Sequence, residues 1–415
     1  GRFVARDFGQ NYLMTLQEEG NPIIFTNGDN DTFPLWYNQE TEGVRTDARV
    51  CNLSYLQTDW YIDQMRRPAY DSPSLPISWT RLQYVTGTRE GIPVQPDALQ
   101  QVIDYYKDSP EDLKQMLGDN PYELKNIIRH WVLNDNPDLQ IFPTDSIVVT
   151  VDKEAVKRSG MMIAADSIPD VMHISLKGKR AIYKSEMMML EMISQANWER
   201  PLYMSTTVGP DNYGHLGDNF VQEGLACRIT PFDTKQSGRT IDSERMYNNM
   251  MNKFKYGGLK ENPDIYLDET VIRMCYTHRR LFNQLAQQLL KEGQKDKALK
   301  VLQRAEEEIP GSIVPHEAFY GHSLELADAW LALGHKAEAE KLLNAVGQNA
   351  KEYIEWYLSL NTQRLLQSSR ECLMQIYILN DIAKTWEPID KKKAETYRME
   401  VNNYASRCHQ RGMSL

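Results

Sequence analysis

Short apolar runs alternate with amphipathic stretches over the first 230 residues, a pattern that predicts a mixture of strands and helices. Residues 7–19 predict a helix, and the apolar run Ile23–Thr26 predicts a short strand. Residues 34–40 predict a second helix with Pro34 in its first turn, where the missing N–H costs nothing. Residues 48–53 predict another strand. The strand, helix and strand form a βαβ unit, so we expect these two strands to be parallel.

The same pattern continues to about residue 230. We expect largely helical structure at residues 96–134, strands at 146–151, 171–176 and 201–206, and a Met-rich helix at 185–196. Residues 1–230 are therefore predicted to form an α/β domain with a mixed or parallel sheet. The polar segment 231–270, which contains a double glycine, is predicted to connect this domain to the next.

Residues 271–415 predict an all-helical domain that contains a repeat. Two stretches share small residues, a glycine and apolar residues at tetratricopeptide spacings, 41 residues apart, with Ala286, Gly293 and Ala298 in the first and Ala327, Gly334 and Ala339 in the second. Small residues let two helices pack closely, and glycine permits the turn between them. Because the usual period is about 34 residues, residues 311–321 are predicted to be an insertion or a longer helix.

Composition narrows the function classes. A hydrophobic fraction of 41% with 25% charged residues is typical of a folded globular protein. The net charge of −10 argues against nucleic-acid binding, which needs a basic surface. The sequence contains no phosphate-binding glycine loop, no dinucleotide fingerprint and no paired-histidine zinc motif, so no cofactor is predicted. The five cysteines are widely spaced and are predicted to be single buried thiols, although one disulfide is compatible with their number.

The loop that follows the first strand is the candidate site. It comprises Asn27, Asp29, Asn30, Asp31 and Thr32 around a glycine, between a strand end and a helix start, where open α/β sheets place ligands. Three interpretations are open. The two aspartates could hold a divalent cation as a D-x-D motif, the loop could contact a ligand or acceptor, or an aspartate or threonine could cap the helix. Contact with an acceptor is favoured over metal binding.

Four runs, FTNGDNDTFPLWY, VCNLSYLQTDWYIDQM, NWERPLY and EGLACRITP, resemble a bacterial family of multi-pass membrane proteins labelled a domain of unknown function. The membrane half of that family resembles the protein O-mannosyltransferases, which use lipid-linked sugars, and its soluble extracytoplasmic part carries tetratricopeptide-like repeats. No apolar run here approaches the roughly 20 residues of a membrane-spanning helix. Because the chain also starts at Gly1 rather than at methionine, we expect it to be a fragment of a longer protein.

The resemblance implies a function for the whole protein and a role for this part. The parent would transfer a sugar, most simply mannose, to a serine or threonine of an acceptor protein, with its general base in the membrane half. The chain would lie in the periplasm, contact the parent's membrane domain and bind the acceptor through Asn27–Thr32. The order of strand, carboxylate-bearing loop and helix is similar to that around the acceptor-binding loop of the oligosaccharyltransferase catalytic subunit. The alternative is a non-enzymatic module whose helical repeats bind a peptide.

Overall fold

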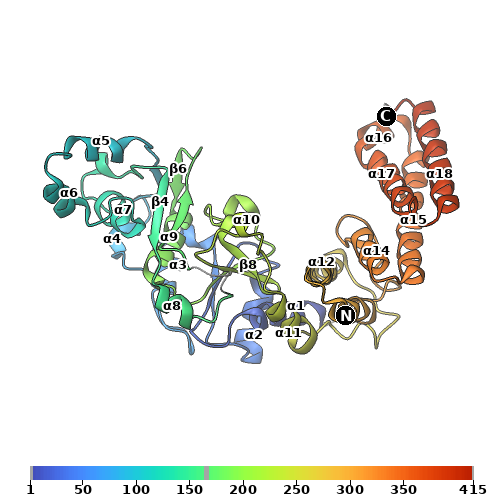
Figure 1. Cartoon of the computed structure of the whole chain (residues 1–415), viewed down its shortest axis with the longest axis horizontal. Helices are drawn as coiled ribbons and strands as arrows, with labels where there is room; N and C mark the ends of the chain where they lie inside the picture. Colours follow the sequence, from blue (N-terminus) through green and yellow to red (C-terminus); the bar gives the residue numbers. More distant parts are fainter. Residues whose placement is uncertain (1–2, 163–167, 414–415) are drawn as a thin grey trace. The chain divides into compact units, whose positions relative to one another are not determined.

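The computed structural model describes residues 3–162 and 168–413; Gly1 lies outside the described residues. The chain divides into two compact units, which are described separately. The sheet unit comprises residues 6–255, and the helical unit comprises residues 256–415 together with the first five residues of the chain. Figure 1 shows the course of the chain through both units.

Within the described residues, the sheet unit contains a main sheet of five strands in the order β2-β1-β7-β9-β8. These strands are β1 (Ile23–Thr26), β2 (Arg49–Asn52), β7 (Leu202–Ser205), β8 (Phe220–Gln222) and β9 (Ala226–Ile229). β1 is parallel to both β2 and β7, whereas β9 is antiparallel to β7 and β8. The sheet is therefore mixed, with a parallel half and an antiparallel half.

The parallel half contains the predicted βαβ unit. Helix α2 (Phe33–Glu42) connects β1 to β2, and the register places Ile23 opposite Arg49. This confirms the predicted parallel pair. Helix α1 (Val4–Thr15) ends earlier than the predicted residue 19. After Thr15 the Arg45 guanidinium donates to the carbonyls of Leu13, Leu16 and Gln17, which satisfies this end of the helix.

Two smaller antiparallel sheets and several short helices complete much of the sheet unit. The sheets pair β4 (Ser146–Thr150) with β5 (Val171–Ser175), and β3 (Gly91–Pro93) with β6 (Ala181–Tyr183). The helices are α3 (Asp59–Met65), α4 (Arg81–Tyr84), α5 (Ala98–Tyr105), α6 (Pro110–Leu117), α7 (Leu124–Ile127) and α8 (Lys153–Arg158). The predicted helical stretch 96–134 is thus broken into pieces, because Pro110 starts one helix and Gly118, with φ +83°, ends it.

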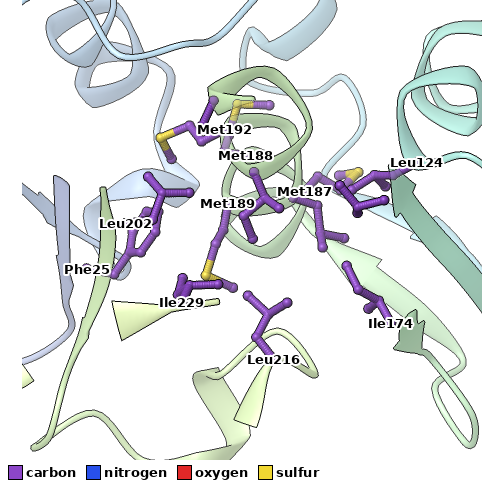
Figure 2. Close-up of a cluster of buried hydrophobic side chains, with 14 of the residues drawn as sticks. Phe25, Leu124, Ile174, Met187, Met188, Met189, Met192, Leu202, Leu216 and Ile229 are labelled. Carbon is purple, nitrogen blue, oxygen red and sulfur yellow. The ribbon is translucent and has the colours of Figure 1, made fainter. Parts of the chain in front are cut away.

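Helix α9 (Lys184–Ala196) carries the centre of the core. Its methionines 187, 188, 189 and 192 are at most 1% exposed. Figure 2 shows them between Phe25 and Leu202 of the main sheet on one side and Leu124 and Ile174 on the other. Flexible methionine side chains suit the irregular space between the main sheet on one side and α7 and β5 on the other.

The antiparallel half of the main sheet escaped prediction. Strands β8 and β9 are three and four residues long and are joined by a tight turn at Glu223-Gly224-Leu225. Gly224 has φ +152°, and a Cβ there would lie 2.7 Å from the Thr15 hydroxyl, so only glycine fits this turn. The segment predicted to connect the domains carries α10 (Thr234–Ser237) and α11 (Ser243–Asn248).

The helical unit contains pairs of helices joined by short turns. They are α12 (Glu269–Lys291) with α13 (Lys295–Glu308), α14 (Ser323–Ala332) with α15 (Lys336–Ser359), and α17 (Ser369–Trp386) with α18 (Lys391–Gln410), with the short α16 (Thr362–Gln367) before the last pair. This confirms the predicted all-helical region. The predicted small residues Ala286, Ala298, Ala327 and Ala339 are fully buried.

The turns and the spacing of the first two pairs also follow the sequence. Gly293 and Gly334 have φ +74° and +82°, the left-handed conformation that a tight helix-helix turn requires. Residues 310–322, between α13 and α14, form no helix, so an inserted loop accounts for the 41-residue spacing. All five cysteines are free thiols, and four of them are buried. In the described part of the chain, no helix is both long and apolar enough to cross a bilayer.

Candidate functional site

Three parallel strands end side by side at one edge of the main sheet. Because β1 lies between β2 and β7, the residues that follow Thr26, Asn52 and Ser205 leave the sheet at the same edge. The predicted loop, Asn27–Thr32, follows the central strand of the three and leads into α2. Its position is therefore the one expected for a ligand site in an open α/β sheet.

Asp31 holds this loop from the inside. The residue is only 3% exposed. One carboxylate oxygen accepts a hydrogen bond from the Gly28 N–H at 2.8 Å. The other accepts from the Thr207 hydroxyl at 2.9 Å and from the Asn27 N–H at 3.4 Å. Since both oxygens are engaged within the protein, Asp31 fixes the shape of the loop and ties it to the segment after β7.

Thr32 and Asn27 connect the loop to β2. The buried Thr32 hydroxyl lies 2.8 Å from the Thr26 hydroxyl and accepts a hydrogen bond from the Asn52 amide at 2.9 Å. Asn27 accepts from the Ser54 hydroxyl through its backbone carbonyl at 3.0 Å and its side-chain oxygen at 2.9 Å. The residues after all three parallel strands thus share one hydrogen-bond network.

The helix-capping interpretation of this loop is right about the position of Thr32 but wrong about its side chain. Thr32 occupies the N-cap position of α2, but its side chain makes no capping hydrogen bond. The Asp29 carbonyl accepts from the Phe33 N–H at 2.9 Å, so the backbone rather than a side chain satisfies the start of the helix. Pro34 lies in the first turn as predicted.

Asp29 and Asn30 form the exposed tip of the loop, next to the exposed Gly28. Among the described residues, neither side chain has a hydrogen-bond partner. The two aspartates therefore differ in their surroundings, since the Asp29 carboxylate faces solvent and the Asp31 carboxylate is used inside the protein. Across residues 3–162 and 168–413, no three His, Cys, Asp or Glu side chains gather as a metal site would need.

Tyr12 and Ser205 belong to the same cluster and were not predicted. The Ser205 hydroxyl donates to the buried Tyr12 hydroxyl at 3.1 Å and lies 2.8 Å from the Thr207 hydroxyl. Burial and the charge of Asp31 raise the pKa of Tyr12 to about 12, so its hydroxyl stays protonated. The sequence does contain a signal for this cluster, the hydroxyl residues 205–207 at the end of the apolar strand β7. They indicate a part of the loop site only once β7 is known to lie beside β1.

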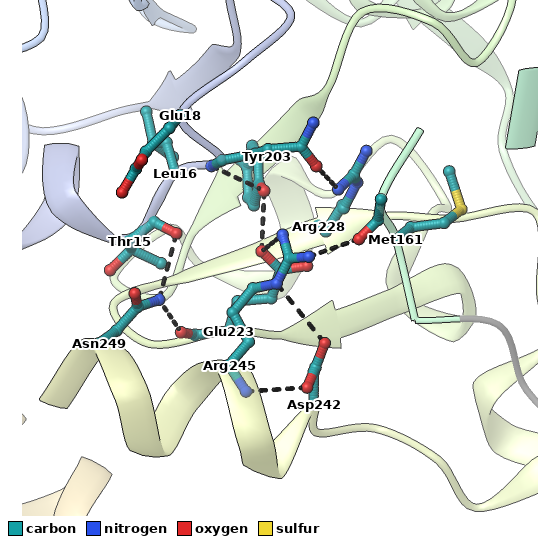
Figure 3. Close-up of polar contacts among 12 residues, drawn as sticks. Thr15, Leu16, Glu18, Met161, Tyr203, Glu223, Arg228, Asp242, Arg245 and Asn249 are labelled. Atoms are coloured by element: carbon teal, nitrogen blue, oxygen red, sulfur yellow. Dashed lines mark hydrogen bonds and ion pairs between the residues drawn. The ribbon is translucent and has the colours of Figure 1, made fainter. Parts of the chain in front are cut away.

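A second polar cluster is buried in the antiparallel half of the main sheet (Figure 3). Glu223 is fully buried, and its carboxylate accepts from the Tyr203 hydroxyl at 2.8 Å and from Arg245 at 3.3 Å. Burial raises the pKa of Glu223, and the charges of Arg228 and Arg245 oppose this. Arg228 is 1% exposed and donates to the Ser159 carbonyl at 2.8 Å. This cluster joins β7, β8 and β9 to the helices around them.

The two aspartates of the loop are expected to differ sharply in their effect on stability. Asp31→Ala should lower the free energy of unfolding of the sheet unit by about 2 kcal/mol, because the Gly28 N–H and the Thr207 hydroxyl lose their buried acceptor. Asp29→Ala, at the exposed tip, should change it by less than about 0.5 kcal/mol. Urea denaturation of the two variants measures the difference. Equal losses would show that the loop is not held by Asp31.

The fold and the loop define a class of protein: a mixed α/β unit with a polar loop at the carboxyl edge of its parallel strands, followed by a helical unit. Residues 5–249 match the family model described as TMEM260-associated domain 2, a domain of unknown function. This match covers more than half of the 415 residues, and the chain belongs to that family. The comparison with curated proteins found no match, and neither did the comparison with solved structures.

Proposed function

We propose that this chain is the acceptor-contacting, extracytoplasmic part of a membrane-bound protein glycosyltransferase. The enzyme would transfer a sugar, most simply mannose, from a polyprenyl phosphate to a serine or threonine hydroxyl of a protein in the periplasm. The observation that carries the proposal is the rigid loop at the carboxyl edge of the sheet, which presents Asp29 and Asn30 to solvent. The sequence resemblance to the membrane-protein family with an O-mannosyltransferase-like half supports the reaction class.

The loop suits an acceptor polypeptide because of what its tip offers. A carboxylate accepts strong hydrogen bonds from backbone N–H or hydroxyl groups, and an asparagine amide both donates and accepts. Asp31 and Thr32 already hold the loop through bonds to Thr26, Asn52 and Thr207 outside it, so little conformational entropy is lost when a partner binds. In this proposal Asp29 and Asn30 contact the acceptor, while Asn27, Asp31 and Thr32 position them.

The proposal assigns the chemical step to another part of the parent. A general base is needed to take the proton of the acceptor hydroxyl, and the resemblance places that carboxylate in the membrane half. The chain by itself is therefore expected to bind acceptor without transferring sugar.

The test uses the full-length parent in its own membrane. Asp29→Ala combined with Asn30→Ala should reduce acceptor glycosylation at least tenfold, because the tip loses its charge and its amide while the fold is kept. Intact-mass analysis of the acceptor measures the sugar content. The control is Asp135→Ala, which removes an exposed carboxylate from a different loop of the same unit. Normal transfer by the Asp29 and Asn30 double variant would refute the acceptor role.

A second candidate function is peptide binding by the helical unit, for which we propose a tetratricopeptide-like arrangement. The observation that favours it is a groove of about 590 Å³ lined by aromatic side chains. Tyr266, Phe319, Tyr320 and Tyr353 line this groove and are 43–89% exposed. Large rigid aromatic side chains give a peptide contact area at a low entropic cost. A groove substitution such as Tyr353→Ala that removed partner binding without changing glycosylation would favour this function.

A further inference from the structure

A cavity of the sheet unit lies along the outer edge of β2. It has a volume of about 530 Å³, within the range of roughly 300–1,000 Å³ that small-molecule sites occupy. Its walls come from α2, from α3 and the turn before it, and from the residues after α3. Its lining includes Trp36, Arg49, Tyr55, Trp60, Tyr61 and Tyr70. We call this cavity the aromatic groove.

Stacked rings form one wall of the aromatic groove. The Trp36 and Tyr55 rings are stacked, with their centroids 6.2 Å apart. The centroid of the Tyr55 ring lies 5.9 Å from that of the Trp60 ring. Trp60 is 54% exposed although it belongs to this ordered row. Aromatic faces of this kind carry negative partial charge and attract the polarised C–H groups of a ring laid on them.

Tyr70 closes one end of the aromatic groove. Its hydroxyl donates to the Glu40 carboxylate of α2, so the loop after α3 is tied across to the opposite wall. Tyr70 has φ +52°, a left-handed conformation that is unfavourable for a bulky residue. Strain of this kind persists where the surroundings require a side chain in one place, and binding sites are common examples.

Arg49 supplies a buried positive charge beside the aromatic groove. The residue is 6% exposed, and its Nη2 donates to the carbonyls of Gln64 at 3.0 Å and Arg67 at 2.7 Å. Among the described residues, Nη1 has no hydrogen-bond partner and no carboxylate pairs with the guanidinium. The charge of Arg49 also acts on a neighbouring arginine, Arg200. Burial first, and the charge of Arg49 second, lower the pKa of Arg200 to about 10. A buried charge is normally paired, so the Arg49 guanidinium is suited to pair with an anionic group.

The edge of β2 beside the aromatic groove is not open to a peptide strand. The Tyr61 hydroxyl lies 2.9 Å from the Asn52 N–H, which donates to it, and 3.4 Å from the Val50 carbonyl. The Gln39 amide donates to the Ala48 carbonyl at 2.9 Å. These side chains occupy the groups through which a peptide would extend the sheet. The occupant is therefore a compact molecule rather than an extended chain.

We propose that the aromatic groove binds a single sugar ring that carries an anionic oxygen group. The ring lies on the row of Trp36, Tyr55 and Trp60, and the anion pairs with Arg49. The anion is either a phosphate ester on the sugar or the carboxylate of a uronic acid. This site is separate from the loop at Asp29 and does not depend on the acceptor role proposed for that loop.

Direct binding to the chain tests the proposal. Saturation-transfer NMR and tryptophan fluorescence would be recorded with glucose 1-phosphate, glucuronate, methyl glucoside and inorganic phosphate. We expect at least one of the two charged sugars to bind at least tenfold more tightly than methyl glucoside and than phosphate alone, because only a charged sugar uses both the rings and Arg49. The stronger of the two identifies the anion.

Variants assign the binding to the aromatic groove. Trp60→Ala should weaken binding of the charged sugar at least tenfold, whereas Trp356→Ala, which removes an equally exposed tryptophan (54%) from the helical unit, should leave it unchanged. Arg49→Gln should remove the preference for the charged sugar over methyl glucoside. If Arg49→Gln fails to fold, the ligand series and Trp60→Ala still decide the question.

Several outcomes would overturn the proposal. They are equal binding of methyl glucoside and the charged sugars, no binding of any sugar at millimolar concentration, and binding that Trp60→Ala leaves unchanged. Inorganic phosphate that bound as tightly as glucose 1-phosphate would show a simple anion site without a sugar ring. None of these results bears on acceptor glycosylation by the Asp29 and Asn30 variant, so the two proposals fail separately.

Discussion

Glu223→Ala is expected to lower the free energy of unfolding of the sheet unit by about 3–5 kcal/mol. The Glu223 carboxylate is fully buried and accepts hydrogen bonds from Tyr203 and Arg245. Arg228, 1% exposed, adds a second positive charge close by. Without the carboxylate, the buried Arg228 guanidinium loses a nearby counter-charge, Arg245 keeps only Asp242, and the Tyr203 hydroxyl loses its acceptor (Figure 3).

The loss is measured by urea denaturation, with hydrogen exchange of β7 and β9 to locate it. Glu199→Ala is the matched control, because the Glu199 side chain is 63% exposed and pairs with Arg158 at 3.6 Å in solvent. Exposed pairs contribute less than about 1 kcal/mol, so this variant should behave almost as the wild type. A loss below about 1 kcal/mol for Glu223→Ala would mean that the charges of the cluster are not mutually dependent.

An element of this fold could be predicted when the hydrophobic pattern of its own residues was sufficient to reveal it. The strand Ile23–Thr26 and the methionine helix were predictable because their residues alone are apolar at the right spacing. The hairpin of β8 and β9 was not, since its strands are short and its residues include the buried Glu223 and Arg228. Those charges are stable inside only because other segments supply partners, and no local pattern reveals this.

The candidate site at Asn27–Thr32 could likewise be predicted only where neighbouring residues determine it. The position of Asp29 at the end of a strand and the start of a helix could be predicted from neighbouring residues. The inward orientation of Asp31 could not, because its partner Thr207 is 176 residues away in the sequence. Nor could the aromatic groove be predicted, since its walls come from α2, β2 and α3, which meet only in the folded chain. Sequence patterns give the location of a loop, whereas the long-range contacts decide which of its side chains remain available.

The helical unit is expected to lose stability as the pH falls from about 6.5 to about 3, because His278 on α12 is buried in its neutral form. Burial lowers the pKa of His278 from its usual 6.5 to about 3. Its ring packs edge-on against the buried Tyr256 ring at 5.2 Å, with no carboxylate among the groups that shift its pKa. Between pH 6.5 and about 3, His278 is protonated in the unfolded chain but neutral in the folded chain. The free energy of unfolding therefore decreases as the pH falls.

The expected slope from this residue is about 1.4 kcal/mol per pH unit, which amounts to about 3 kcal/mol between pH 7 and pH 4. The His278→Gln variant keeps a polar side chain that does not titrate, so its stability should depend less on pH by that amount. Urea denaturation at pH 7, 5.5 and 4, with hydrogen exchange of α12 and α13 to report on this unit, compares the two proteins. His409→Gln, near the exposed end of α18, is the control and should follow the wild type. Parallel pH dependences for wild type and His278→Gln would show that His278 takes up its proton without unfolding the unit, and that acid acts on the carboxylates instead.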